Sequence, residues 1–584
     1  MVNSNYAKER VMDKLESLRK IMVEEGLAAL LIPHADEFQG EMLPPRAERL
    51  KWLTGFTGSA GFAVVTLDKA AFFTDARYLL QAKQQLSSEY EIYNTFSLSP
   101  SRWLSDTVEA KGKVGYDAWL FTETQIQKYS LPLTSLENHP LDKLWTDRPL
   151  PTHDPIVLYP LEYAGEESQS KCNRIAKSLK VDQVLVTAPD SVAWLLNIRG
   201  SDAPYTPLVN AMCLLYKDGS YELFVDLQKV TKPVENYIQQ GGGHVFEFQN
   251  LISRLKKLKG TCQVDPGTAP ILLLHVLQTA GVNIVRETDP CLLPKALKNP
   301  IECEGARQAH IQDGLALCRF FAWLEQAPLQ GETTEITTAE KLLGFRKQGK
   351  NFMGPSFLTI SSFGPHGAIV HYHPTPTSDV PLKRNGIYLV DSGGQYLGGT
   401  TDVTRTLTLG IPSEEEKNYY TRVLKGHIAF AKAIFPETTT AGQLDSFARQ
   451  FLWQIGADYN HSTGHGVGSY LNVHESPPLT SPRVIGEPLR PGMILSNEPG
   501  YYKEGHYGIR IESLMMVKEI PHLKGFYGFE TLTLAPVDMN LIDMSLLTEE
   551  EKIWIKDYHC RIFDTLAPHL DEKTTQWLEK TTQF

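Results

Sequence analysis

The sequence predicts a multidomain protein of mixed α/β and α+β class, with two related α/β domains ahead of a third domain. Three observations lead to this prediction. The chain has 584 residues, which at roughly 150 residues per domain allows two to four hydrophobic cores. Helix-like and strand-like stretches alternate over the first half, as α/β domains require. A short motif also recurs in that half.

The recurring motif is a Trp-Leu pair followed by a Gly-Ser pair. Each copy follows an apolar run (28–32 and 181–186) and precedes a strand-like run (62–66 and 222–225). We interpret the motif as an internal repeat, with a chance match of four residues as the alternative. The two copies, 142 residues apart, are Trp52-Leu53 with Gly58-Ser59 and Trp194-Leu195 with Gly200-Ser201.

Two breaks separate the predicted domains. Residues 146–160 are proline-rich and read as a linker, because proline lacks an amide donor and restricts the residue before it. Further on, Asn299 can cap a helix and Pro300 suits its first turn, where Glu302 complements the helix dipole. We therefore expect domains at 1–155, 156–297 and 298–584, with a long helix opening the third.

The third domain contains an apolar run at 386–391 and a Thr- and Val-rich stretch at 400–409, with glycines between them. This pattern predicts a β-hairpin. Asp391 and Asp402 are equidistant from its predicted tip, and directly opposed residues have Cβ atoms about 4.5 to 5.5 Å apart. Two buried carboxylates repel each other, so a bound cation is the natural reason for their placement.

A second unit of similar form follows. Residues 493–498 and 508–512 surround a glycine-containing turn and offer two more carboxylates, Glu498 and Glu512. The two-residue period of a strand puts Arg510 on the same face as Glu512. Arg510 is therefore expected to orient a carboxylate through a charge-assisted hydrogen bond.

Between the two units lies the segment HSTGHGVG, where glycines let the imidazole of His465 approach a crowded centre. The four carboxylates carry a charge that two divalent ions would offset and one would not. Oxygen-rich ligation with a single imidazole favours Mn²⁺ or Co²⁺, although affinity alone leaves Zn²⁺ open. Because paired ions activate water and polarise carbonyls, amide hydrolysis is the expected reaction.

The composition of the chain argues against several classes of function. The formal net charge is -11 over 65.5 kDa without long single-sign runs, so neither nucleic acid nor an anionic membrane is an expected partner. The first twenty residues lack the apolar core of a signal peptide, and no window is apolar enough to span a bilayer. We expect a cytoplasmic enzyme. The seven cysteines are dispersed, which argues against a disulfide framework or a thiolate metal site.

These residues resemble the M24 "pita-bread" metallopeptidases, whose five ligands follow the order Asp, Asp, His, Glu, Glu. The matching positions are Asp391 in VDSGGQY, Asp402 in GTTDVTRT, His465 in HSTGHGVGS, Glu498 in SNEPGYY and Glu512 in GIRIES. The resemblance implies that Asp402 and Glu512 bridge two metal ions. It further implies that Asp391 chelates one ion, and that His465 and Glu498 bind the other.

Three further histidines match catalytic positions of that family: His371 in AIVHYHP, His461 in the segment before His465, and His474 in LNVHESP. The resemblance assigns His371 and His461 to substrate binding or proton transfer. It assigns His474 to stabilising the tetrahedral intermediate, which a nearby hydrogen-bond donor can do.

Within the family, the stretches HGVGSYLNVHE, NEPGYY and DVTRTLTLG are more similar to the three-domain cytosolic aminopeptidase P branch than to methionine aminopeptidase or prolidase. The resemblance continues upstream through FTGSAG, TDARYLLQA, AWLLNIRGSD and KNPIECEGARQAH. It implies two creatinase-like α/β domains followed by a pita-bread catalytic domain, in a homodimer. A hydroxide bridging two metals would cleave the bond before a penultimate proline, so the expected partners are peptides with proline second.

Two alternatives remain open. The first is a prolidase, which would share the metal site but accept only Xaa-Pro dipeptides. The second is a binding protein that keeps the fold without catalysis. Such relatives usually lose ligands, whereas this sequence has all five.

Overall fold

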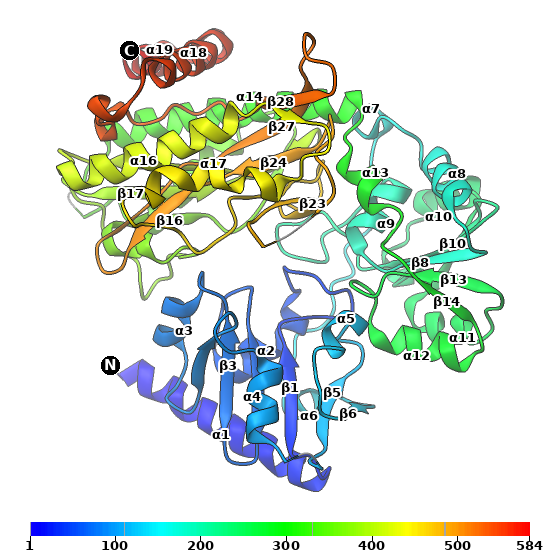
Figure 1. Ribbon diagram of the computed structural model, residues 1–584. Coiled ribbons are helices and arrows are strands. Elements are labelled where there is room, and N and C mark those ends of the chain that lie inside the picture. The colour runs from blue at the N-terminus through cyan, green and yellow to red at the C-terminus, as the bar shows by residue number, and fades with distance from the viewer. Residues whose placement is uncertain (1, 110, 330, 484–485, 584) are drawn as a thin grey trace. The chain divides into compact units, whose positions relative to one another are not determined.

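The computed structural model describes residues 2–109, 111–329, 331–483 and 486–583, and the elements named below lie within those ranges. The chain divides into two compact units. Residues 1–160 and 166–291 form the first unit, and residues 161–165 and 292–584 form the second. Figure 1 shows the sheets and helices of each unit.

The first unit contains two six-stranded sheets with the same strand order, β4-β3-β2-β1-β5-β6 and β12-β11-β10-β8-β13-β14. The first sheet consists of β1 (Ala29–Pro33), β2 (Phe62–Thr66), β3 (Ala70–Thr74), β4 (Glu91–Asn94), β5 (Val114–Asp117) and β6 (Leu133–Leu136). The second consists of β8 (Gln183–Val186), β10 (Met212–Tyr216), β11 (Tyr221–Val225), β12 (Gly243–Glu247), β13 (Thr261–Val264) and β14 (Asn283–Arg286).

The two sheets share strand directions as well, which confirms the predicted repeat. In the first sheet β1 runs antiparallel to β2 and parallel to β5, and in the second β8 runs antiparallel to β10 and parallel to β13. Trp52 lies on α2 (Arg49–Thr54) and Trp194 on α9 (Pro189–Leu196), in each case between the first two strands of its sheet. Strands β1 and β8 are buried along their whole length, as continuous apolar runs in covered sheets usually are.

Helices pack on both sheets of the first unit. Leu18 on α1 (Val2–Glu24) and Leu53 on α2 share one core with Leu30 of the first sheet. The remaining helices are α3 (Leu79–Gln85), α4 (Pro100–Thr107), α5 (Glu123–Ile126), α6 (Pro140–Leu144), α8 (Ser168–Ser178), α10 (Lys232–Gln240), α11 (Leu251–Leu255) and α12 (Ile271–Thr279). The proline-rich stretch 146–160 has little regular structure apart from β7 (Val157–Leu158), which pairs with β9 (Ile198–Arg199).

The second unit opens with α13 (Leu292–Ala296) and the long helix α14 (Pro300–Gln326), which confirms the predicted helix. Asn299 caps α14 in a reciprocal capping box with Glu302. The short helix α7 (Leu161–Ala164) belongs to this unit although it precedes the second sheet in sequence. The Asn299 side chain donates to the carbonyl of Ala164 at 2.8 Å, which attaches α7 to the start of α14.

The strands of the second unit form two groups of sheets, or halves. One half comprises the sheets β15-β18-β19 and β16-β17-β20, and the other comprises β21-β28-β27-β24-β22-β23 with the ribbon β25-β26. The strands of the first half are β15 (Phe352–Pro355), β16 (Ile360–Phe363), β17 (Ile387–Ser392), β18 (Gly394–Tyr396), β19 (Gly399–Thr400) and β20 (Val403–Thr408). Those of the second are β21 (Phe435–Pro436), β22 (Gly464–Gly466), β23 (Glu475–Thr480), β24 (Ile494–Asn497), β25 (Gly500–Lys503), β26 (Tyr507–Arg510), β27 (Ser513–Glu519) and β28 (Phe526–Thr531).

Figure 1 shows α16 (Glu414–Ala431) and α17 (Ala441–Trp453) side by side over these strands. The other helices of the second unit are α15 (Glu335–Arg346), α18 (Glu549–Leu566) and α19 (Glu572–Thr582). Leu424 of α16 and Ile555 of α18 pack with Ile509 of β26 in one core.

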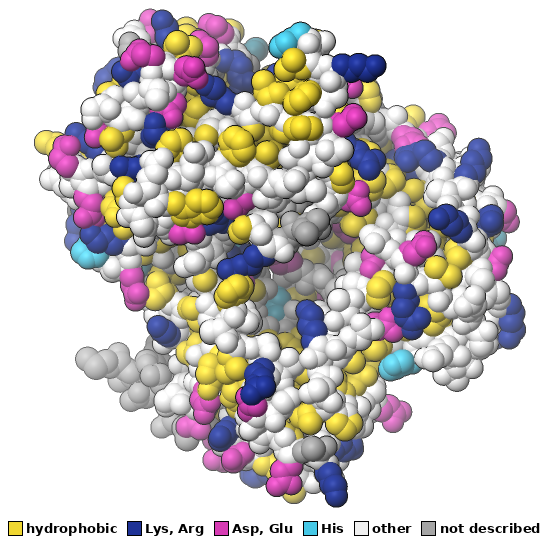
Figure 2. All heavy atoms as spheres, in the orientation of Figure 1, with side chains coloured by type: hydrophobic (Ala, Val, Ile, Leu, Met, Phe, Trp, Pro, Cys, Tyr) yellow, Lys and Arg dark blue, Asp and Glu magenta, His cyan; other side chains and the backbone are white. Residues whose placement is uncertain are grey.

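The distribution of charged side chains on the surface is consistent with the modest net charge of the chain. On the face shown in Figure 2, basic and acidic side chains are interspersed. Within the described residues, no helix combines the length and the apolar character that crossing a bilayer would require. The seven cysteines are free thiols, as expected from their dispersed positions.

Candidate metal centre

Asp391 and Asp402 come from the predicted hairpin, but its register differs from the prediction. Strands β17 and β20 pair so that Asp391 lies opposite Thr404, and the tip falls at Leu397 and Gly398. The predicted tip was one residue too early, and the direct opposition of Asp391 and Asp402 was wrong. Residues two apart on a strand still share a face, so Asp402 lies diagonally across from Asp391.

Glu498 and Glu512 come from the second half, for which the sequence predicted the two carboxylates but no strand register. Strand β24 pairs with β27 so that Asn497 lies opposite Ser513. Extending this ladder by one residue brings Glu498 opposite Glu512. Glu512 is 1% exposed, and its Oε2 accepts a hydrogen bond from the Thr404 hydroxyl at 2.8 Å. This bond connects the two halves at the level of the carboxylates.

His465 lies on β22 with its ring fixed by the backbone. Its Nδ1 donates to the carbonyl of Gly466 at 2.8 Å, since a carbonyl oxygen only accepts. The opposite ring nitrogen, Nε2, then faces Oδ2 of Asp402 at 3.5 Å and Oε1 of Glu498 at 3.6 Å. A histidine oriented through one nitrogen presents the other as a ligand, as metal-binding histidines do.

All five predicted ligands therefore converge, and together with His474 they form three overlapping groups. In each group the potential ligand atoms lie within 4.8 Å of one another. The groups are Asp391-Asp402-Glu512, His465-Glu498-Glu512 and Asp402-His465-His474.

The chemistry of this cluster fits divalent ions. The Oδ1 atoms of Asp391 and Asp402 are buried and accept no hydrogen bond from the described residues. Buried polar atoms are nearly always satisfied, so such carboxylate oxygens require a partner. A set of oxygen ligands with one imidazole is what Mn²⁺ and similar ions accept.

The carboxylates also hold their protons unusually firmly. Burial raises the pKa of Asp391 to about 7, and the negative charge of Asp402 adds to this rise while Arg510 opposes it. Burial likewise raises the pKa of Glu498, and raises that of Glu512 well above its usual range, with neighbouring carboxylates adding to both shifts. Burial and mutual repulsion therefore disfavour the charged form of these carboxylates when no cation is bound.

Arg510 orients one carboxylate, as the strand period predicted. Its guanidinium donates to Oδ2 of Asp391 at 2.6 Å and to the hydroxyl of Tyr502 at 2.7 Å. Tyr502 was missed by sequence reasoning, although it lies in the quoted NEPGYY stretch. Only the pairing of β25 with β26 places it beside Arg510.

His461 is connected to the same network. Its Nδ1 donates to the carbonyl of Ser462 at 2.8 Å, which leaves Nε2 to accept from the Tyr502 hydroxyl at 2.9 Å. A continuous chain of hydrogen bonds thus runs from Asp391 through Arg510 and Tyr502 to His461. Burial raises the pKa of Tyr502 to about 12, so this hydroxyl keeps its proton at neutral pH.

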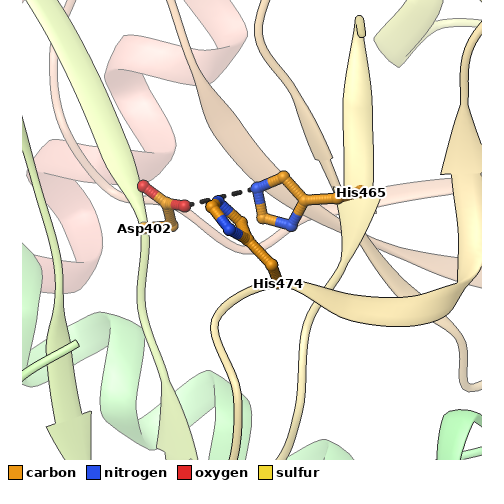
Figure 3. A group of neighbouring side chains, drawn as sticks. All are labelled: Asp402, His465 and His474. Atoms are coloured by element: carbon orange, nitrogen blue, oxygen red, sulfur yellow. Dashed lines mark ion pairs between the residues drawn. The ribbon is translucent and has the colours of Figure 1, made fainter. Parts of the chain in front are cut away.

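His474 lies against the ligand cluster. Figure 3 shows its ring directed toward the ion pair between Asp402 and His465. The rings of His474 and His465 are 4.4 Å apart and nearly perpendicular. By contrast, His371 and His461 join none of the three ligand groups in the described part of the chain. His371 is half-buried beside Tyr372.

Comparison with known families covers nearly the whole chain. Residues 304–519 match metallopeptidase family M24, and residues 525–584 match the C-terminal region of peptidase M24. Residues 14–145 and 147–302 each match the creatinase/prolidase N-terminal domain. The fold class predicted from the sequence is confirmed by these matches.

Full-length relatives are similar throughout. Aminopeptidase P1 of Lotus japonicus is 36% identical, covering 97% of this chain and 99% of that protein. A probable Xaa-Pro aminopeptidase P of Laccaria bicolor is 39% identical, covering 97% and 92%. The crystal structure of X-prolyl aminopeptidase from Caenorhabditis elegans is described as a cytosolic enzyme with a di-nuclear active site. It matches with a TM-score of 0.93 at 32% identity, over 98% of this chain and 99% of that one.

Proposed function

This chain belongs to metallopeptidase family M24, and we propose that it is an Xaa-Pro aminopeptidase, which hydrolyses the bond between an N-terminal residue and a penultimate proline. It is a metalloaminopeptidase with creatinase-type N-terminal domains. The observation that carries the proposal is the convergence of the five expected ligands in one buried cluster. The chain aligns end to end with relatives named for this activity.

We assign two divalent metal ions to the cluster. Asp402 and Glu512 would be shared by the two ions, Asp391 would complete one site, and His465 with Glu498 would complete the other; these five residues lie within the three groups described above. Mn²⁺ is the preferred ion, with Co²⁺ or Zn²⁺ as alternatives. When bound, the ions supply an activated water and polarise the scissile carbonyl. Elemental analysis of purified enzyme would identify them.

The histidines handle the substrate and its protons. A proline nitrogen has no N–H to offer and must gain a proton before it leaves. We assign His371 and His461 to substrate binding or proton transfer, and the Tyr502 hydroxyl orients the His461 ring by donating to it at 2.9 Å. His474, directed toward Asp402 and His465, would donate a hydrogen bond to the tetrahedral oxyanion.

The remaining organisation extends the proposal. Three domains would occupy residues 1–155, 156–297 and 298–584, and the compartment would be the cytoplasm, as described for the C. elegans enzyme. A homodimer is proposed because Phe447, Trp453 and Ile455, on or just after α17, are 40%, 47% and 39% exposed. Exposed apolar groups of this kind mark association surfaces. Sedimentation analysis would give the oligomeric state.

The decisive experiment compares Arg-Pro-Pro with Arg-Pro as substrates, after metal removal and again with added Mn²⁺. Metal-dependent release of arginine from the tripeptide is the expected result. Cleavage of the dipeptide alone would instead identify a prolidase. Cleavage of neither peptide would favour the non-catalytic alternative.

A further inference from the structure

A buried cluster of charged side chains is formed around the residue that follows His474 in the sequence. Glu475 follows His474, and its carboxylate contacts the ammonium groups of Lys298 at 2.6 Å and Lys295 at 3.3 Å. The three side chains are 0%, 2% and 1% exposed, respectively. Burying three ions is costly unless their geometry is well satisfied, so such a cluster needs a reason.

The position of Glu475 supplies that reason. Glu475 is the first residue of β23 and pairs with Gly466 of β22, whose carbonyl accepts the ring proton of His465. A Cβ on Gly466 would collide with the carbonyl of Glu475, so the two backbones need glycine at this point. Glu475 is thus held between β22, the strand that carries His465, and the adjoining residue His474.

The lysines fix Glu475 from the other side. Lys295 lies on α13, which packs against β23. Lys298 follows α13, and its backbone N–H donates to the carbonyl of Gly492 at 3.2 Å. Lys298 therefore forms a charge-assisted hydrogen bond with one carboxylate oxygen, and Lys295 holds the other oxygen by charge alone at 3.3 Å. Any shift of Glu475 would move the adjoining His474.

The origin of the lysines is unexpected. Residues 295 and 298 lie within the range 147–302 that matches the creatinase/prolidase N-terminal domain, ahead of the M24 match at 304–519. They nevertheless belong to the compact catalytic unit, which begins again at residue 292. The segment before the catalytic domain thus contributes side chains that reach a residue adjacent to the site.

We propose that Lys298 and Lys295 are positioning residues that act through Glu475 to hold His474 in its working place. This inference rests on the proposed function, in which His474 stabilises the transition state. Misplacing a catalytic group by about an ångström can cost on the order of a hundredfold in rate, so loss of one of the two lysines should cost about tenfold.

The test is a double-mutant cycle of Lys298→Met and His474→Ala, with Arg-Pro-Pro as substrate in the Mn²⁺-loaded enzyme. Lys298→Met should lower kcat about tenfold and leave KM and metal content unchanged. His474→Ala should lower kcat about a hundredfold. In the double variant, Lys298→Met should lower kcat hardly further than His474→Ala alone, because the lysine acts through the histidine that has been removed. If the two losses of kcat instead multiply in the double variant, the proposal is wrong.

A matched control separates positioning from stability. Lys425→Met breaks another buried lysine-glutamate pair of the same unit, in which Lys425 contacts Glu551 at 2.5 Å. It should lower the unfolding temperature as Lys298→Met does, with kcat unchanged. An equal loss of kcat in both variants would mean that Lys298 acts only on stability.

Two further experiments separate a failure of this inference from a failure of the proposed function. If Lys298→Met fails to fold, Lys298→Gln with Glu475→Gln replaces the pair without leaving a buried charge, and the same cycle is run with it. Absence of tripeptide cleavage by the unmodified enzyme, or full activity of His474→Ala, would refute the proposed function or the role of His474. Only the arms that change Lys298 test the positioning.

Discussion

Two buried sites, one in each compact unit, treat charge in opposite ways. In the first unit, Lys229 and Asp202 are buried together at 2.6 Å, and the second oxygen of Asp202 accepts the N–H of Asn210 at 2.7 Å. In the second unit, Asp391 and Asp402 each leave a buried oxygen without a hydrogen bond from the described residues. A fully paired ion maintains structure, whereas an uncompensated cluster is arranged for a ligand that brings the missing charge.

The largest expected effect comes from Asp402→Asn, which removes charge from the uncompensated cluster. Since metal ions supply several kcal/mol of transition-state stabilisation, kcat/KM should fall at least about a thousandfold, together with bound metal. The metal-free protein should become more stable, because the charge of Asp402 raises the pKa of Asp391 and Glu512. Steady-state kinetics, metal analysis and thermal unfolding in chelator would check this, and near-normal activity with full metal content would contradict the site assignment.

The same substitution in the first unit should act in the opposite direction. Asp202→Asn leaves Lys229 buried without its counterion, which should destabilise the protein by about 3 to 5 kcal/mol. The kcat of the folded fraction should stay unchanged, because no catalytic group is touched. Denaturant unfolding beside Asp402→Asn would show the contrast, and a stabilising effect of Asp202→Asn would break it.

The pH dependence of the metal-free enzyme gives a further test. A carboxyl group whose pKa rises on folding binds more protons in the native state, so native stability falls as pH increases between the two values. For Asp391 this window runs from 3.8 to about 7. The unfolding temperature in chelator should therefore decrease across that range. Saturating Mn²⁺ should remove the decrease, because bound metal replaces the protons, and parallel curves with and without metal would contradict this account.

The smallest expected effect is that of Tyr502→Phe, which interrupts the hydrogen bonds from Arg510 to His461. One hydrogen bond contributes about 0.5 to 1.5 kcal/mol, so kcat should fall by no more than about tenfold. Metal content should remain unchanged, since no ligand is lost. Loss of metal from this variant would mean that Tyr502 supports Asp391 through Arg510, and not the orientation of His461.

The sequence predicted the parts of the site that depend on local order, and missed those that depend on long-range contacts. Asp391, His465 and Glu498 could be found because each lies in a short motif with its own turn or strand pattern. The hairpin tip was misplaced by one residue because two Gly-Gly pairs lie at or near it and make alternative turns equally acceptable.

The contacts of Glu475 could not be anticipated in this way. Its partner Lys298 lies 177 residues earlier, and no local pattern in either segment signals the pairing. A lysine before a helix is ordinarily a solvated surface group. Only the packing of α13 against β23 removes both partners from water.

The path of the chain between the two units has a practical consequence. Residues 161–165 belong to the catalytic unit, residues 166–291 leave it, and residue 292 returns to it. The module of the second sheet is thus an insertion with two covalent connections, so one proteolytic cut inside it would leave each fragment with part of the catalytic unit. A recombinant fragment that begins at residue 292 would also lack α7 and the bond from Asn299 to Ala164. Producing functional fragments of this enzyme would therefore require new connections between chain ends as well as suitable cleavage positions.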